Sequence, residues 1–326
     1  MQKINWGIIG CGDVTEIKSG PAFNKVSNSA LVAVMRRDAA KAEDYARRHQ
    51  VPTWYSNADE LINDPGVNAI YIATPPSSHE EYTLAALNAG KSVYVEKPMS
   101  LNAASANVMM NAARETGGKL VVAHYRRGQP FFKKIKELID KNTIGGIRFA
   151  RMDYFKKPLS KTELETKGIS WRVDPAISGG GLFHDLAPHQ LDLMYYFFGE
   201  AEAVSGYAIN QQKIYAADDL VSANILFRSG VVFNGLWCFN SDEASEKDSC
   251  EIVGEMGSIR FTVFGEQKII LTVKGKTEII SFDSLPHVQQ PMIEEVVSYF
   301  LDHGTNPCTA EDGVKVMEMI DNITGK

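Results

Sequence analysis

Asp185, His189 and Asp192 have the side-chain types and the spacing that proton transfer requires. Apolar residues recur at helical spacing over 185–198, which predicts a helix with the three polar side chains on one face at i, i+4 and i+7. An imidazole titrates near neutral pH, and a carboxylate one turn away can orient and tune it. The glycines at 179–181 let the backbone approach another group closely. The alternative is an N-capped surface helix whose polar residues carry no function.

The start of the chain carries a second pattern with chemical meaning. The apolar run Ile4–Ile9 predicts a buried strand, and the following residues read G-x-G-x-x-T from Gly10 to Thr15. In a dinucleotide-binding turn, the first glycine makes the turn, the second lets a pyrophosphate approach, and the helix N-terminus attracts its charge. Thr15 replaces the usual third glycine, so we expect slightly looser helix–strand packing. The predicted contacts in this loop are Gly10, Gly12, Asp13 and Val14, and the alternative is a plain glycine turn.

The end of the next predicted strand, 31–35, indicates which nucleotide is bound. An NAD site usually has an acidic residue here for the ribose hydroxyls. This chain has Arg36 and Arg37 instead, and Asp38 comes two positions late. Two guanidinium groups suit a 2′-phosphate through charge and bidentate hydrogen bonds, so we expect NADP as cofactor, with NAD as the second choice. The alternative is a solvated basic turn that opens the helix 39–49.

Short apolar strands alternate with helices through the first part of the chain. Such alternation is typical of a doubly wound parallel sheet, the Rossmann type of α/β fold. We therefore predict a nucleotide-binding domain over 1–123. Ligands of these sheets bind at the carboxyl ends of the strands. The candidate segments at that edge are Gly10–Val14, Arg36, Thr74–His79 and Glu96-Lys97, and the later predicted strands are 69–73, 92–95 and 120–123.

The second half changes character, with consecutive strands joined by short turns. This pattern predicts a large, mostly antiparallel open sheet, with the helix 185–198 on one face, in a C-terminal α+β domain over 124–326. The terminal helices, near 292–303 and 309–323, are candidates to pack back on the first domain. The other face of the sheet carries apolar residues, which favours an oligomer. The predicted strands cover 147–155, 203–210, 220–228, 231–240, 249–253, 258–263, 268–273 and 278–282.

The connection Lys156–Ser178 is long and polar and shows no periodicity. Connections of this length in a compact domain are usually functional lids or disordered segments. Near its end, Trp171 can stack on a ring and Arg172 can hold substrate hydroxyls. The alternative is a buried tryptophan that anchors the loop.

Composition excludes several classes of function. A chain of 326 residues predicts two domains, and a net charge of −6 gives no basic excess for nucleic-acid phosphates. No apolar run is as long as a membrane span and no N-terminal signal pattern is visible, so we expect no membrane partner. His184 and His189 are five residues apart, off one helical face, which argues against a metal site. The four cysteines are scattered, as expected for reduced thiols in a cytoplasmic protein.

Several of these motifs together resemble the glucose–fructose oxidoreductase, inositol dehydrogenase and MocA-like (Gfo/Idh/MocA) family. The resemblance covers nearly the whole chain. Its most specific part is Glu96-Lys97-Pro98, followed much later by Asp185 and His189. The matching segments are Gly10-x-Gly12, Thr74-Pro75 followed by His79, Ala89 to Pro98, and Trp171-Arg172-x-Asp174-Pro175 leading into the glycines at 179–181.

The resemblance implies an oxidoreductase that moves a hydride between a nicotinamide and a sugar, keto-sugar, cyclitol or related polyol. It implies that His189 gives or takes the proton at the substrate oxygen and that Asp185 binds substrate or tunes His189. Lys97 would hydrogen-bond the reacting oxygen and stabilise alkoxide charge. The family commonly forms subunit contacts through the free sheet face, which implies a homodimer or homotetramer. The implied cofactor residues also include Thr74, Pro75, His79, Glu96 and Lys97, and the implied substrate residues are Tyr125, Trp171, Arg172, Asp185 and His189.

Two other functions fit part of the pattern. A non-catalytic NADP-binding sensor on the same fold needs only the cofactor half, so the presence of Lys97, Asp185 and His189 together argues against it. A glycosidase that uses a tightly held nicotinamide for transient oxidation is the second alternative. Absence of net NADPH turnover would distinguish that glycosidase from a dehydrogenase.

Overall fold

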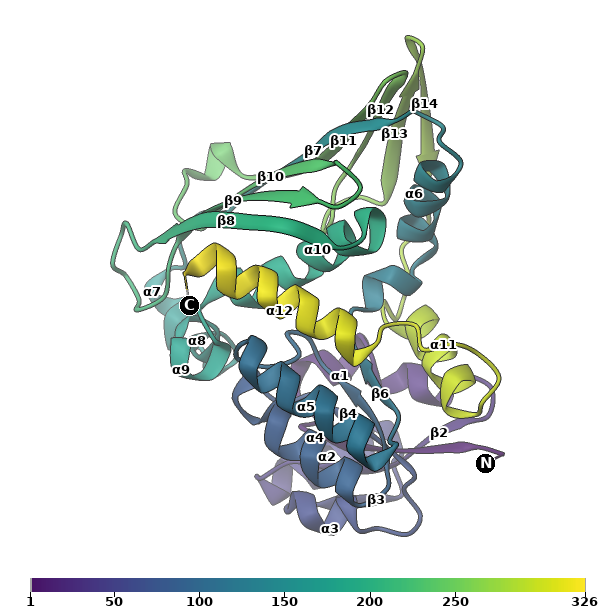
Figure 1. The fold of residues 1–326 in the computed structure, drawn as a ribbon. Helices are drawn as coiled ribbons and strands as arrows, with labels where there is room; N and C mark the ends of the chain where they lie inside the picture. The colour runs from purple at the N-terminus through teal and green to yellow at the C-terminus, as the bar shows by residue number, and fades with distance from the viewer. Residues whose placement is uncertain (1, 326) are drawn as a thin grey trace. The chain divides into compact units, whose positions relative to one another are not determined.

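The structure is a computed structural model, and it describes residues 2–325. The chain forms two compact units, whose helices and strands are labelled in Figure 1. The predicted domain boundary lies at 123/124, whereas the first unit continues to Gln129 and also includes a segment from the C-terminal part of the chain. Unit 1 comprises Met1–Gln129 and Leu285–Val314, and unit 2 comprises Pro130–Ser284 and Lys315–Lys326.

A six-stranded parallel sheet forms the centre of unit 1, in the order β3-β2-β1-β4-β5-β6. The chain therefore starts in the middle and adds strands outward in both directions, which confirms the predicted doubly wound arrangement. Every residue of β4 is buried, as expected for a strand covered on both faces. The short strand β3 beside β2 was not predicted. The strands are β1 (Ile4–Ile9), β2 (Ser29–Met35), β3 (Thr53–Tyr55), β4 (Ala69–Ile72), β5 (Ser92–Val95) and β6 (Leu120–Val122).

The helices of unit 1 begin and end at residues suited to those positions. Asp38 accepts the N–H of Lys41 at the start of α2, and Asn102 caps α5 in the same way. α5 ends at Gly117, which has a φ of +63°. α11 belongs to this unit although it comes from the C-terminal part of the chain. The helices are α1 (Asp13–Ile17), α2 (Ala39–His49), α3 (Ala58–Ile62), α4 (His79–Asn88), α5 (Ala103–Thr116) and α11 (Gln290–Phe300).

Aromatic side chains pack together on β1, β4 and β5. Trp6, Tyr71 and Tyr94 are fully buried, and the stacked rings of Tyr71 and Tyr94 have centroids 5.2 Å apart. Phe23 contacts both Trp6 and Tyr71, with centroid distances of 4.7 and 5.3 Å. Burying a side chain of this size contributes roughly 1.5–3 kcal/mol. The cluster therefore holds the hydroxyls of Tyr71 and Tyr94 in fixed positions inside the unit.

Unit 2 contains an eight-stranded sheet in the order β14-β13-β12-β11-β7-β10-β9-β8. β7 and β10 pair in parallel, and the other neighbours are antiparallel. The predicted open, mostly antiparallel sheet is therefore confirmed. Its strands are β7 (Ile147–Phe155), β8 (Ala201–Ile209), β9 (Leu220–Phe227), β10 (Val232–Cys238), β11 (Lys247–Gly254), β12 (Gly257–Phe261), β13 (Lys268–Val273) and β14 (Lys276–Ser281).

The helix α10 (Leu182–Phe198) is the buried helix of unit 2 and lies along one face of the sheet (Figure 1). It begins three residues before the predicted start and contains Pro188 inside the helix. Trp237 on β10 donates its indole N–H to Gln190 Oε1 at 2.6 Å. The surface-helix alternative is wrong, because most of α10 is buried. Although α10 is largely apolar, no helix in residues 2–325 combines the length and apolar character that crossing a membrane requires.

The opposite face of this sheet exposes apolar side chains. Burial alternates along β9 and β10, so one side of each strand is covered and the other is open. Val232 pairs with Phe149 on β7 and with Leu226 on β9, and all three are exposed. We call these three residues the apolar row. Other exposed apolar residues on strands of this sheet are Tyr207, Ile209 and Ile279.

The connection at 156–178 consists of short helices and a 3-10 turn, so it has secondary structure that the sequence pattern did not predict. Ser160 and Glu163 form a capping box in which each side chain bonds the backbone N–H of the other. Asp174 caps the last of these helices by accepting the N–H of Ala176 at 3.0 Å. The helices are α7 (Lys161–Glu165), α8 (Lys167–Ser170) and α9 (Pro175–Ser178), with a 3-10 turn η4 (Trp171–Val173). Two longer helices complete the fold, α6 (Pro130–Asp140) in unit 2 and α12 (Ala310–Thr324), which spans both units.

Candidate active site

The two glycines after β1 are required for different reasons. Gly10 has a φ of +92°, and a Cβ there would lie 2.7 Å from Thr74 Cγ2 and 2.9 Å from Thr74 N. The fold itself therefore excludes a side chain at Gly10. Gly12 has an extended backbone, and a Cβ there would meet nothing closer than Gly10 O at 3.8 Å. Because the protein leaves space above Gly12, the loop fits the close approach of a pyrophosphate.

Thr15 closes the glycine loop instead of loosening it. Its hydroxyl accepts the Gly12 N–H at 3.0 Å and donates to Gly12 O at 2.8 Å. Thr15 is fully buried, and its carbonyl accepts the hydroxyl of Tyr45 at 2.8 Å. A Cβ at Gly20 would lie 2.2 Å from the same carbonyl oxygen. The close backbone approach in this motif is thus made at Gly20, and the expected looser packing at Thr15 is not found.

Arg36 lies against the glycine loop. Its Nη1 donates to the carbonyl oxygen of Cys11 at 3.1 Å, and the residue is partly buried, whereas Arg37 is exposed. Asp38 is engaged at the start of α2, where the N–H of Lys41 holds the pKa of its carboxyl below the usual value. The two guanidinium groups and no acidic side chain directly follow β2, as the sequence predicted.

Glu96 and Lys97 follow β5 at the same edge of the sheet. The Glu96 carboxylate is buried, and its Oε2 accepts the backbone N–H of Lys97 at 3.1 Å. Its Oε1 accepts hydrogen bonds from the Tyr71 hydroxyl and from Gln289 Nε2. The Lys97–Pro98 peptide bond is cis, and Lys97 is partly exposed. The buried Glu96 carboxylate thus bonds the backbone from which the Lys97 side chain extends, and we describe Glu96 as lying behind Lys97.

His79 joins the two loops that follow β4 and β5. Its ring is fully buried, with Nε2 2.7 Å from Thr74 O and Nδ1 3.0 Å from Pro98 O. Burial lowers the pKa of His79, although the two carbonyl oxygens oppose that shift. Thr74 in turn accepts a hydrogen bond from Ser78 at 2.8 Å. The predicted cofactor residues of unit 1 are therefore linked by contacts along one edge of the parallel sheet. These contacts run through Arg36, Cys11, Gly10, Thr74, His79 and Pro98.

In unit 2, α10 carries the predicted proton-transfer residues. Asp185 is partly exposed near the start of the helix, His189 is 5% exposed, and Asp192 is fully buried. The His189 ring packs edge-on against Phe264, with centroids 5.7 Å apart. Asp192 therefore has no solvent-facing role, while Asp185 keeps access to the surface.

Arg172 pairs with Asp185, a contact that the sequence analysis missed. Its Nε donates to Asp185 Oδ2 at 3.0 Å, and another guanidinium nitrogen bonds the carbonyl oxygen of Gly168. The guanidinium lies 4.7 Å from the ring centroid of Trp171. Both side chains of the pair are mostly buried, at 25% and 14% exposure, so the ion pair is only partly screened by solvent. In unit 2 the structure therefore brings together Trp171, Arg172 and Asp185.

The glycines before α10 make room for protein groups. A Cβ at Gly180 would lie 2.1 Å from the buried ring of His184. Gly181 has a φ of +89°, and a Cβ there would lie 2.3 Å from the Cβ of Ala217. The connection between β8 and β9 therefore packs on the beginning of α10. These contacts explain both glycines without a ligand.

The same connection contains Tyr215, which no sequence motif singled out. Its hydroxyl is buried and has no hydrogen-bond partner among the residues that the structure describes. Burial, with the nearby Asp219 carboxylate adding to it, raises the pKa of Tyr215 to about 12. The Asp219 carboxylate accepts the backbone N–H groups of Gln211 and Gln212 at 2.8 and 2.9 Å. Tyr215 is thus a buried donor on the connection that packs on the beginning of α10 through Ala217.

The remaining predicted substrate residue, Tyr125, lies in unit 1 directly after β6. It opens the 3-10 turn η3 (Tyr125–Gly128), and its ring is buried. The guanidinium of Arg126 lies 5.6 Å from the centroid of that ring. Among residues 2–325, no three histidine, cysteine, aspartate or glutamate side chains gather as ligands for a metal ion. The predicted site residues thus form two groups, one in each unit.

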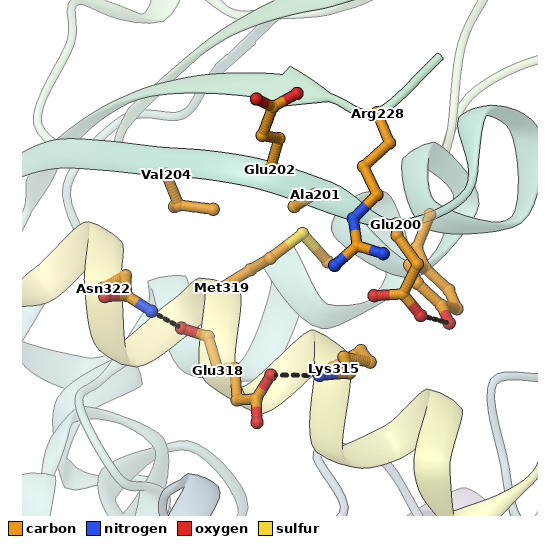
Figure 2. A pocket seen from close by; sticks show the side chains of 10 residues that line it. Glu200, Ala201, Glu202, Val204, Arg228, Lys315, Glu318, Met319 and Asn322 are labelled. Atoms are coloured by element: carbon orange, nitrogen blue, oxygen red, sulfur yellow. Dashed lines mark hydrogen bonds and ion pairs between the residues drawn. The ribbon is translucent and has the colours of Figure 1, made fainter.

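Unit 2 also contains a cavity of about 240 Å³ (Figure 2). Figure 2 shows Arg228 reaching from the sheet into the hollow above α12. Lys315 Nζ pairs with Glu318 Oε2 at 2.9 Å, and the Tyr195 hydroxyl donates to Glu200 at 3.0 Å. None of the predicted catalytic, cofactor or substrate residues lines this cavity. We therefore assign it no part in the reaction.

Two family models match the chain. The model described as an oxidoreductase family with an NAD-binding Rossmann fold matches residues 4–124. The model described as a GFO/IDH/MocA C-terminal domain matches residues 132–260. The first match includes the glycine loop and Glu96-Lys97, and the second includes Asp185 and His189.

Known relatives and solved structures agree with these matches. Oxidoreductase P35 of Formosa agariphila is 48% identical over 324 residues, covering 99% of both chains. Trans-1,2-dihydrobenzene-1,2-diol dehydrogenase of Mus musculus is 31% identical, over 70% of this chain and 66% of its own length. A structure of levoglucosan dehydrogenase in complex with NADH and levoglucosan has a TM-score of 0.89 at 22% identity, covering 99% of this chain and 96% of that one. The last comparison concerns the fold alone.

Proposed function

Because the chain belongs to the GFO/IDH/MocA oxidoreductase family, we propose that it is a nicotinamide-dependent dehydrogenase or reductase for CH–OH groups. The proposed substrate is a sugar, keto-sugar, cyclitol or related polyol. The names of the relatives support this class, since one acts on a diol and another fold neighbour was solved with an anhydrosugar. The observation that carries the proposal is the buried Glu96 behind Lys97 at the cofactor edge of unit 1.

The cofactor half of the proposal rests on the glycine loop and the arginines after β2. The space above Gly12 accommodates the pyrophosphate, and the bond from Arg36 to Cys11 holds one guanidinium beside that loop. Arg36 and Arg37 favour the 2′-phosphate of NADP over the hydroxyls of NAD. The loop at Thr74 and Pro75 borders the same edge through its contact with Gly10. When bound, the nicotinamide supplies the carbon that gives or takes the hydride.

The catalytic half assigns one task to each polar side chain. The Lys97 ammonium donates a hydrogen bond to the reacting oxygen and stabilises negative charge that develops there. His189 moves the proton at the same oxygen as general acid or base. Asp185, held by Arg172, orients the substrate or the imidazole. Tyr125, Trp171 and Arg172 are the remaining proposed substrate contacts.

We also propose that the chain forms a homodimer or homotetramer through the outer face of the eight-stranded sheet. The apolar row crosses three neighbouring strands, and exposed rows of this kind usually mark an interface. Val232→Lys places a charge at the centre of the row and is expected to shift the protein to monomers. Light scattering over a range of concentrations measures this, and a monomer mass throughout for the unmodified protein would contradict the assembly.

A substrate screen tests the proposed activity. Sugars, keto-sugars and cyclitols are incubated with NADP, NADPH, NAD or NADH, and the absorbance of the reduced nicotinamide is followed. The proposal predicts net cofactor turnover with at least one compound, and turnover lower by about 10²-fold or more with the Lys97→Met variant. Cofactor binding without net turnover on the whole panel would contradict a dehydrogenase.

A further inference from the structure

A side chain from the C-terminal segment of unit 1 reaches the residue behind the proposed catalytic lysine. Gln289 donates its amide Nε2 to Glu96 Oε1 at 2.6 Å. The Tyr71 hydroxyl donates to the same oxygen, and the Lys97 backbone N–H donates to the other carboxylate oxygen at 3.1 Å. Gln289 and Tyr71 are fully buried, and Glu96 is 7% exposed. One oxygen of Glu96 thus faces the core and the other faces the backbone of Lys97.

Gln289 is itself held in place on several sides. Its Oε1 accepts the Tyr94 hydroxyl at 3.2 Å, and its backbone N–H donates to the carbonyl oxygen of Lys18 at 3.2 Å. Gln289 is also the residue directly before α11, so the helix backbone restricts the direction of the Gln289 side chain. Its amide group therefore cannot turn away without breaking bonds to other parts of the same unit.

The two tyrosines are donors at ordinary pH. Burial, and next the Glu96 carboxylate, raise the pKa of Tyr71 and that of Tyr94 well above the usual value. Their hydroxyls keep their protons, so each one donates. Because Tyr71 and Gln289 both donate to Oε1, rotation of the Glu96 carboxylate would break two buried bonds.

We propose that Gln289 is a positioning residue for Lys97 and that it acts through Glu96. By holding Oε1, Gln289 and Tyr71 aim Oε2 at the N–H of Lys97 and fix the backbone at the cofactor edge of the sheet. The effect of Gln289 on turnover rests on the proposed function. Its effect on the position of Lys97 does not, since the hydrogen bonds lie within unit 1. If Gln289 had only a structural role, it would stabilise the contact of α11 with the sheet, and its loss would not change the position of Lys97.

The experiment measures the reactivity of Lys97 directly, without substrate. The full-length protein is labelled with trace isotopic acetic anhydride, and mass spectrometry quantifies each lysine peptide. Lys91 and Lys119 serve as internal references, because each ammonium is held by carbonyl oxygens of unit 1 that do not involve Gln289. Gln289→Leu removes the donor at similar volume. Gln290→Leu is the matched control, since the Gln290 side chain donates to Glu294 Oε1, four residues along α11, in an exposed contact.

The expected result is a change confined to Lys97. Gln289→Leu should label Lys97 about threefold faster or more, as a group released from a fixed backbone, while the reference lysines and the control variant stay unchanged. If Gln289→Leu folds poorly, Tyr71→Phe keeps the ring, removes the second donor and should give the same change. Unchanged Lys97 labelling in both variants, or equal increases at Lys91 and Lys119, would overturn the proposal.

Hydride transfer then separates this inference from the proposed function. With any substrate found in the screen, Gln289→Leu should lower turnover about tenfold, the cost of one hydrogen bond to a charged group, and leave the KM for NADPH nearly unchanged. The loss should vanish in a Lys97→Met background, because no ammonium remains to be positioned. An equal loss in that background would overturn the positioning role. An inactive wild type with altered Lys97 labelling would instead refute the proposed function and leave the positioning role standing.

Discussion

Arg172 and Asp185 form an ion pair in unit 2, with Arg172 Nε donating to Asp185 Oδ2 at 3.0 Å. The two residues are 13 positions apart, on a 3-10 turn and on α10. The sequence analysis gave each of them a separate contact with substrate. The pairing means that Arg172 also determines where the Asp185 carboxylate points, so the two side chains should act as one group.

The first prediction concerns this pair. Arg172→Leu leaves the Asp185 carboxylate without its guanidinium donor, and turnover should fall about 10- to 100-fold, the range for a hydrogen bond to a charged group. Steady-state kinetics measures the loss, and Arg148→Leu, which removes an exposed arginine paired with Glu255, is the control. In an Asp185→Asn background the effect of Arg172→Leu should shrink. Losses that multiply fully would mean that Arg172 acts independently of Asp185.

The second prediction concerns cofactor choice. The unmodified protein should bind NADPH more tightly than NADH, because Arg36 and Arg37 can bond the 2′-phosphate. Arg36→Asp combined with Arg37→Ala should erase a preference of about tenfold or more, as charge-assisted bonds are lost. Fluorescence titration of both cofactors measures this, with the exposed Arg47→Ala as a charge control. Equal affinities of the unmodified protein for NADPH and NADH would contradict the assignment.

The third prediction separates the two glycines of the loop. Gly10→Ala should destabilise the fold by at least ~1 kcal/mol, because the backbone has positive φ and the methyl group meets Thr74. Gly12→Ala should change stability by less than ~0.5 kcal/mol, since the methyl group would make only an ordinary contact with Gly10 O at 3.8 Å. It should nevertheless weaken NADPH binding about tenfold, which corresponds to ~1.4 kcal/mol. Thermal melts and NADPH titrations on both variants test this. Unimpaired NADPH binding by Gly12→Ala would show that the pyrophosphate does not bind at this loop.

The fourth prediction concerns pH and stability. His124 is buried in unit 1, and burial, followed by the Arg127 guanidinium, holds its pKa well below the ordinary 6.5. The unfolded chain takes up this proton below about pH 6.5 while the folded chain does not, so stability falls as the pH drops through that value. Urea unfolding at pH 7.5 and 5.5 should show a smaller loss for His124→Gln than for the unmodified protein. Burial also lowers the pKa of His79. The His124→Gln variant should therefore still lose some stability as the pH drops.

The exposed His303 provides the control for this experiment. His303→Gln removes a histidine that is open to solvent and should leave the difference between the two pH values as it is in the unmodified protein. If His124→Gln and the unmodified protein lose the same stability between pH 7.5 and 5.5, then His124 is not the buried neutral group described here.

Patterns within short windows predicted the parallel sheet and most of the antiparallel one. β4 is a continuous apolar run of the kind that is covered on both faces, and β10 shows the alternation of a strand covered on one face. The start of α10 was predicted three residues late because the glycines at 179–181 discourage a helix directly before it. The capping box of Ser160 and Glu163 was readable in the sequence, but helices of four or five residues show no apolar period.

Only those residues of the candidate site that belong to a recognisable sequence motif could be predicted. Lys97 and His189 were predicted as site residues because motifs surround them, and the glycine loop because it follows a buried strand. Gln289 could not be found, since its contacts with Glu96 and Tyr71 join residues 193 and 218 positions apart. The reason for Gly180 was equally hidden, because only the folded chain shows the His184 ring beside it.

We propose that Lys97 and His189 act mainly at the reacting oxygen and contribute little to the affinity for the cofactor. Gly12 and Arg36 are assigned to the far parts of the nucleotide, so removing Lys97 or His189 should spare binding. Loss of His189 removes general acid–base help worth about 10²–10⁴-fold, and loss of Lys97 removes charge stabilisation of order 10²–10³-fold. Because both side chains are proposed to act on one oxygen, the double variant should be less impaired than the product of the two single losses.

The measurement that tests this claim most directly is single-turnover hydride transfer by Lys97→Met and His189→Ala, with NADPH titrated on the same samples. Each variant should lose about 10²-fold or more in the rate of hydride transfer, with near-normal NADPH affinity and intact folding. Near-normal hydride transfer in both variants would contradict the mechanism and favour a protein that binds NADPH without catalysis.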